Sequence, residues 1–348
     1  MELSDTIIAA LIGMFGGTVL GLAARLGRFC TLGALEDALY GADMRGLRMW
    51  SLAIGTAIAG TFTIAALGWL ELADTVYART ALDPAASIVG GVIFGYGMAM
   101  AGNCGLGALA RLGGGDLRSF VVVVVMGISA YVTLNGPLAA LRIALFPQET
   151  TAATEVIGFA HLIAAPLGSS PLLPALLIAA ALAGWALSDP GFRSTRRAFW
   201  AMAAGLAIVS AWLGMGLLSA ASFEDLSPVS HRFTAPLGEA LLYLMTSSGG
   251  GLSFAIGSVA GVLAGALCGA LIQAQFRWEA CDDPRELGRQ IAGAALMGMG
   301  GVIALGCSVG QGLTAFSTLA FSAPVVLASI AVGAALGLRH LIQGWNAA

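Results

Sequence analysis

The chain has 348 residues, of which 58% are hydrophobic and only 10% are charged. Soluble domains are about 25% charged, so this composition excludes a soluble enzyme and a disordered chain. All basic residues are arginine and the net charge is −3, which provides no basic surface for nucleic acid. The 49 glycines are typical of closely packed membrane helices, where small residues let backbones approach each other.

Nine segments approach the roughly 20 apolar residues that a membrane-spanning helix needs. The sequence therefore predicts an all-α membrane protein with about nine transmembrane helices. The predicted spans are Asp5–Leu26, Leu47–Leu70, Ala85–Gly102, Leu117–Phe146, Pro171–Leu187, Ala198–Ala220, Gly251–Phe276, Leu287–Leu305 and Leu319–Ile342.

The arginines predict the orientation of these spans. With the N-terminus outside, thirteen arginines lie on the cytoplasmic side and three outside, which is a strong positive-inside pattern. The C-terminus is then cytoplasmic. The cytoplasmic set is Arg25, Arg28, Arg45, Arg48, Arg111, Arg118, Arg193, Arg196, Arg197, Arg277, Arg285, Arg289 and Arg339, and the outer set is Arg79, Arg142 and Arg232.

Four apolar segments adjoin predicted spans but are too short to cross a membrane. They are Phe29–Tyr40, Cys104–Gly115, Pro236–Ser248 and Cys307–Phe321. Such segments suit re-entrant helices, whose irregular backbone is tolerated only inside protein or against a water-filled cavity.

A weak internal repeat relates the two ends of the chain at an offset of about 203 residues. We predict a first half at 1–146, a connecting region with the fifth span at 147–197 and a second half at 198–348. One intervening span makes the halves inverted copies, an architecture common in transporters. The matching stretches are 28–33 with 232–238, 53–56 with 255–258, and 88–107 with 291–310. A rival match of Gly13, Gly17 and Gly21 to Gly257, Gly261 and Gly265 is interpreted as helix packing.

The repeat separates the five cysteines into two groups. Cys30, Cys104 and Cys307 occupy three of four equivalent positions, and Thr234 or Ala235 occupies the fourth. Each of the three starts a short helix, whose N-terminus favours anions and thiolates. Three such thiols suit a soft metal such as Cu(I), a soft sulfur-bearing anion, or thiol–disulfide and persulfide chemistry. We expect Cys268 to be a small buried hydrophobe and Cys281 to be an incidental loop thiol.

The motifs around these thiols resemble those of the YeeE/YedE family. They are Gly27–Cys30, Gly102–Gly107 and Gly306–Gly312. The resemblance implies a bacterial inner-membrane, multi-pass transporter of inorganic sulfur compounds, with thiosulfate as the best-known substrate. It also implies a line of three thiols, Cys30, Cys104 and Cys307, and a small cytosolic sulfur-carrier or sulfurtransferase partner.

Polar residues beside the thiols complete the candidate site. Arg28 either attracts an anion or anchors the topology at the interface. Thr234, Ser308 and Asn103 are candidate donors to anionic oxygens, with helix capping as the alternative for Ser308 and Asn103. Gln311 either contacts the substrate or makes an interhelical hydrogen bond.

We therefore predict an importer of thiosulfate or a related sulfur anion that passes along the thiols through weak S–H hydrogen bonds. The alternatives are a transporter of a selenium or persulfide species, a Cu(I) permease, and a membrane thiol redox or sulfur-transfer subunit. No lysine is present to complete a phosphate-binding loop, and we expect no enzyme, cofactor, metal or nucleic-acid partner. His161, His231 and His340 lack ligand companions and are interpreted as surface residues.

Overall fold

The computed structural model describes residues 4–147, 158–193, 196–222, 226–247, 251–280 and 283–344. Over these ranges the fold is helical, and the β-type pairing is limited to an isolated bridge between Asp116 and Glu279. The prediction of an all-α membrane protein is confirmed by seven helical segments that are long and apolar enough to cross a membrane. Their long helices are α1 (Asp5–Leu26), α3 (Arg45–Ala66), α5 (Pro84–Ala101), α7 (Leu117–Leu134), α12 (Arg196–Ala221), α14 (Phe254–Ile272) and α16 (Ser322–Gln343).

The fifth and eighth predicted spans are also helices. α10 (Leu172–Leu187) has 16 residues, and α15 (Pro284–Ile303) begins with a charged first turn. Both are therefore less clearly spanning by length or composition than the other seven, and the count of nine spans stays a prediction.

The predicted span Leu117–Phe146 is wrong in its second half. α7 ends at Leu134, and a separate helix α8 (Ala139–Leu145) follows. Pro137 lies in the break, and proline lacks the N–H that a continuous helix needs. Short helices also occur in the predicted loops: η1 (Leu72–Asp74), α4 (Val76–Arg79), α9 (Phe159–Leu167) and α11 (Pro190–Arg193).

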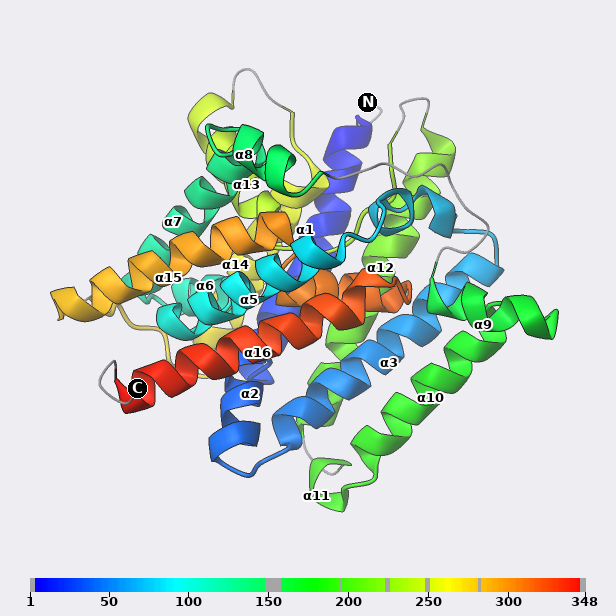
Figure 1. The fold of residues 1–348 in the computed structure, drawn as a ribbon, viewed down its shortest axis with the longest axis horizontal. Coiled ribbons are helices and arrows are strands. Elements are labelled where there is room, and N and C mark those ends of the chain that lie inside the picture. The colour runs from blue at the N-terminus through cyan, green and yellow to red at the C-terminus, as the bar shows by residue number, and fades with distance from the viewer. Residues whose placement is uncertain are drawn as a thin grey trace.

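Glycines bring the long helices into backbone contact. A methyl group added to any of six glycines between α1 and α14 would meet a backbone carbonyl of the opposite helix. These two helices lie along each other near the centre of the molecule (Figure 1). The interpretation of this motif as helix packing is confirmed. The six are Gly13, Gly17, Gly21, Gly257, Gly261 and Gly265.

The contacts also fix the relative directions of several helix pairs. α1 runs parallel to α14, because Gly13 meets Phe254 and Gly21 meets Val262. α5 runs parallel to α16 and antiparallel to α15 by the same kind of contact. Helices from the two predicted halves therefore interlock, and a single hydrophobic cluster contains residues of both.

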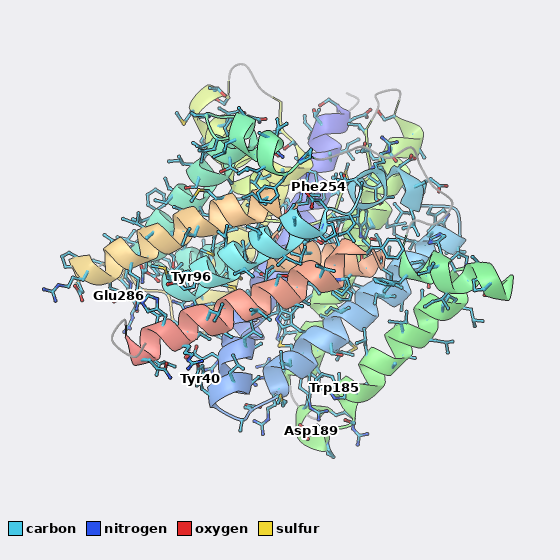
Figure 2. The ribbon with its side chains drawn as sticks, in the orientation of Figure 1. Tyr40, Tyr96, Trp185, Asp189, Phe254 and Glu286 are labelled. Atoms are coloured by element: carbon cyan, nitrogen blue, oxygen red, sulfur yellow. The ribbon has the colours of Figure 1, made fainter. Side chains whose placement is uncertain are left out.

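Four short helices form at the four segments that the sequence predicts as re-entrant. They are α2 (Thr31–Tyr40), α6 (Gly105–Gly113), α13 (Ala235–Thr246) and the π-helix η2 (Gly310–Ala315). In α2 and α13 the first turn is buried and the last turn is exposed. α2 and α13 therefore carry their N-termini into the protein interior. The exposed end of α2, at Tyr40, lies in the lower half of the view, and the start of α14, at Phe254, lies in the upper half (Figure 2).

Candidate functional site

The same local backbone turn precedes each of the three candidate thiols. Two residues before Cys30, Cys104 and Cys307, the chain adopts a left-handed conformation, at Arg28 (φ 57°), Gly102 (φ 76°) and Leu305 (φ 57°). This conformation is strained for arginine and leucine. Strained backbone of this kind concentrates at functional sites, so the repeated turn marks the three thiols as a related set.

The turn places each cysteine at the start of a helix. Cys30 and Cys104 are the N-cap residues of α2 and α6, and Cys307 directly precedes the helical stretch that begins at Ser308. The free N–H groups and partial positive charge of a helix N-terminus favour negative charge. Three such termini therefore give the protein interior a preference for anions.

Backbone N–H groups point at the two inner sulfurs. The Gly107 N–H donates to Cys104 Sγ at 3.5 Å. Cys307 Sγ accepts from the N–H groups of Gly310 at 3.4 Å and Phe233 at 3.3 Å. The Cys30 side chain makes no capping hydrogen bond. Cys104 and Cys307 are buried, whereas Cys30 is partly exposed.

The structure brings the thiols together in the order Cys30, Cys104, Cys307. A methyl group on Gly107 would lie 3.7 Å from Cys104 Sγ and 4.0 Å from Cys30 Sγ, so the two sulfurs flank the same glycine. Phe233 joins Cys104 to Cys307. Its N–H bonds Cys307 Sγ, and its carbonyl oxygen would lie 3.5 Å from a methyl group on Gly105.

Three polar atoms beside the thiols are buried without a hydrogen-bond partner among the described residues. They are Asn103 Oδ1, Thr234 Oγ1 and Ser308 Oγ, on residues that are at most 3% exposed. Buried polar atoms are nearly always paired, and leaving one unpaired costs about 1–3 kcal/mol. Asn103 Oδ1 and Ser308 Oγ make no helix-capping bond, so both atoms are available to a guest molecule.

Gln311 is fully buried and satisfied by protein. Its Nε2 donates to the Ala304 carbonyl at 3.0 Å, and its Oε1 accepts from Ser322 Oγ at 3.2 Å. Of the two roles considered for Gln311, substrate contact and an interhelical hydrogen bond, the structure shows the hydrogen bond. It holds η2 against the end of α15 and the start of α16, and thereby positions the Cys307 turn.

A cavity of about 260 Å³ opens beside Cys30 on the side predicted to be cytoplasmic. Arg28, Arg111 and Arg197 line it. On the opposite side, Arg232 and Glu239 line a cavity of about 230 Å³. Arginines therefore stand at both ends of the thiol line.

Tyr77 is hydrogen-bonded to the segment that follows Cys307. It lines a cavity of about 250 Å³, and its hydroxyl donates to the Gly310 carbonyl at 2.9 Å. Burial raises the pKa of Tyr77 to about 12, so the phenol keeps its proton at neutral pH. α4 is thereby bonded to the segment that carries Cys307.

Two residues differ in burial from the sequence prediction, and three residues near the thiols were not predicted as part of the site. His231 is fully buried rather than on the surface, with Nδ1 hydrogen-bonded to Ser258 Oγ at 2.7 Å. Cys268 is exposed on α14 rather than buried, and Cys281 lies outside the described residues. Trp50 and Tyr77 carried no motif, and Phe233 lay within the repeat match 232–238 without being singled out as a site residue. Within the described ranges no group of three or more His, Cys, Asp or Glu residues is placed to hold a metal ion.

Thiols at helix starts, enclosed by apolar helices long enough to cross a bilayer, define a multi-pass membrane protein with cysteines in its interior. The chain belongs to the Sulphur transport family, whose sequence profile matches residues 26–336, as its resemblance to YeeE/YedE proteins predicts.

Two named relatives place the chain within this family. It is 25% identical to a thiosulfate transporter, TsuA, of Spirochaeta thermophila, over 89% of this chain and 92% of the relative. It is 24% identical to the thiosulfate transporter TsuA of Escherichia coli, over 87% of this chain and 86% of the relative.

Proposed function

We propose that this protein is a bacterial inner-membrane importer of thiosulfate or a closely related sulfur anion. The anion passes Cys307, Cys104 and Cys30 in turn through weak S–H hydrogen bonds. The observation that carries the proposal is the same left-handed turn and helix start at all three thiols, which follow one another in the order Cys30, Cys104, Cys307.

Thiosulfate suits these surroundings chemically. It is a dianion with one soft terminal sulfur and three hard oxygens. Helix N-termini attract its charge, thiols offer weak contacts to its sulfur, and the unpartnered atoms of Thr234 and Ser308 lie within the same interior. Repeated weak contacts favour conduction, because the anion must bind well enough to enter and loosely enough to leave.

The directions of the helix pairs support the nine-span arrangement with inverted halves 1–146 and 198–348. In that arrangement α1 and α14 cross in the same sense, α5 and α15 in opposite senses, and α5 and α16 in the same sense. All three pairs have these directions in the fold. The N-terminus is then periplasmic and the C-terminus cytoplasmic, where a sulfur-carrier protein or sulfurtransferase receives the anion.

The test is uptake of radiolabelled thiosulfate by vesicles that contain the purified protein. We expect Cys104→Ala to lower uptake at least tenfold, because Cys104 is the central thiol. Cys268→Ala is the matched control, since Cys268 is exposed on α14, and it should transport like the wild type. Wild-type uptake by folded Cys104→Ala would overturn the thiol path. Competition of radiolabelled-thiosulfate uptake by unlabelled selenite, sulfite and persulfide shows which of these alternative substrates the protein also accepts.

A second function is supported by the Cys30 thiol, which makes no capping bond and lines the cavity. In a sulfur-transfer subunit, its thiolate attacks the outer sulfur of thiosulfate. The S–S bond breaks, sulfite leaves with the electron pair, and a persulfide remains on Cys30. Mass spectrometry after thiosulfate exposure distinguishes the two functions, because a persulfide adds about 32 Da. An unmodified protein that transports thiosulfate supports the non-covalent path.

A further inference from the structure

The cavity beside Cys30 has features that the thiol path does not use. Arg28, Arg111 and Arg197 come from three different parts of the chain and line the same space. In the described part of the chain, none of the three lies within ion-pair distance of a carboxylate. Glu36 and Asp37 also line the cavity, which leaves a net positive lining.

Trp50 supplies an independent observation in the same cavity. It lines the space and is only 6% exposed, yet its indole N–H finds no acceptor within the described part of the chain. Phe29 stacks on its ring at 4.6 Å between centroids. A methyl group on Gly312 would lie 3.0 Å from Cζ3, on the benzene edge of the ring. The ring is therefore held from two directions, and its N–H lies on the edge opposite the Gly312 contact.

The donors match the oxygens of a small oxyanion. Guanidinium groups bind oxyanions through paired N–H bonds, and the indole N–H is a donor only. A space of about 260 Å³ admits a sulfur oxyanion with several waters, each of which occupies about 30 Å³. Neither guanidinium nor indole offers anything specific to a soft sulfur atom.

We propose that this cavity is a second, thiol-independent anion site that binds divalent sulfur oxyanions through their oxygens at the cytoplasmic mouth. The assignment of this cavity to the cytoplasmic side rests on the proposed function. The ligand class, oxyanions bound through their oxygens alone, goes beyond that function. Sulfate, which lacks the terminal sulfur, binds there without entering the line of thiols. Cytoplasmic oxyanions thus compete with the anion that is leaving Cys30.

The probe is radiolabelled sulfate, bound to the purified full chain in detergent at low ionic strength. We expect saturable binding by the wild type, displaced by thiosulfate, and weakening as chloride is added because guanidinium contacts are screened. Arg197→Gln and Arg111→Gln should each weaken binding at least tenfold. Arg196→Gln is the matched control, with the same charge change on α12 outside the cavity lining, and should stay within twofold of the wild type.

Two further variants separate the site from a general charge effect. Trp50→Phe keeps an aromatic six-membered ring and removes the pyrrole ring with its N–H, so sulfate affinity should fall several-fold without any change of charge. Cys104→Ala should bind sulfate like the wild type. Absence of saturable sulfate binding, or equal losses in Arg196→Gln and Arg197→Gln, would overturn the site even if thiosulfate uptake persists. Sulfate binding without any thiosulfate uptake would instead refute the proposed function and leave the site standing.

Discussion

Arg28 and Leu305 adopt a left-handed conformation that costs a non-glycine residue roughly 1–3 kcal/mol. Both turns have the same geometric result, because each places a cysteine at the start of a helix two residues later. Phe233 links two of the thiol-bearing helix starts through its backbone, because its N–H donates to Cys307 Sγ and its carbonyl oxygen lies near Gly105. Individual residues thus connect the thiols without any covalent bond between them.

Thr234 allows a test of whether the unpaired polar atoms serve the substrate. Thr234→Val replaces a buried, unpartnered hydroxyl with a methyl group of similar size. The thermal midpoint should stay equal or rise, because an unpaired buried hydroxyl costs about 1–3 kcal/mol. Thiosulfate uptake should fall several-fold because a donor to the anion is lost.

Thr61→Val is the control for this experiment, since Thr61 Oγ1 is also buried and unpartnered but lies on α3. It should change stability in the same direction and leave uptake unchanged. Equal uptake by both variants would show that the Thr234 hydroxyl does not contact the anion.

Tyr77 predicts a pH dependence at alkaline pH. Its pKa is about 12 in the fold against an ordinary value of 10.0, so the unfolded chain loses the phenolic proton first. The stability from the neutral phenol is therefore complete below pH 10.0 and is lost as pH rises through about 12. Thermal unfolding of wild type and Tyr77→Phe, measured at about pH 9 and about pH 11, should show a smaller alkaline loss in the variant. Equal losses would contradict the assignment.

At the scale of elements, the interface of α1 with α14 requires glycine where the two backbones touch. Gly261→Ala places a methyl group against the Met14 carbonyl, and overpacking of this kind costs about 1–3 kcal/mol. We expect a clearly lower thermal midpoint in detergent. Gly184→Ala is the matched control on α10, because nothing lies within 4 Å of the added methyl; its midpoint should hold or rise. Similar midpoints would contradict the close approach.

Composition and hydropathy were sufficient to predict the positions of the long helices, because a membrane span requires a long apolar run. They did not locate the break after Leu134, since the residues beyond Pro137 are as apolar as those before it. The short thiol-bearing helices were predictable from glycine and cysteine spacing. The roles of Trp50 and Phe233 were not, because an unpaired indole N–H and a backbone segment shared by two thiol sites exist only after distant segments pack.

At the scale of the whole molecule, the proposed orientation predicts one-sided access to Cys30. A membrane-impermeant maleimide should label Cys30 in inside-out vesicles and not in right-side-out vesicles, in a variant without Cys268 and Cys281. Cys104 and Cys307, at 1% and 2% exposure, should resist labelling from either side. Labelling of Cys30 only in right-side-out vesicles would reverse the topology.

The contact of α1 with α14 also has a consequence for biosynthesis. α1 ends at Leu26 and α14 starts at Phe254, so the first helix emerges from the ribosome long before its closest partner exists. At about 5–20 residues per second, the delay is on the order of ten to fifty seconds. During that interval the glycine groove of α1 faces lipid or the insertion machinery, and the final docking step waits for the second half of the chain to enter the bilayer.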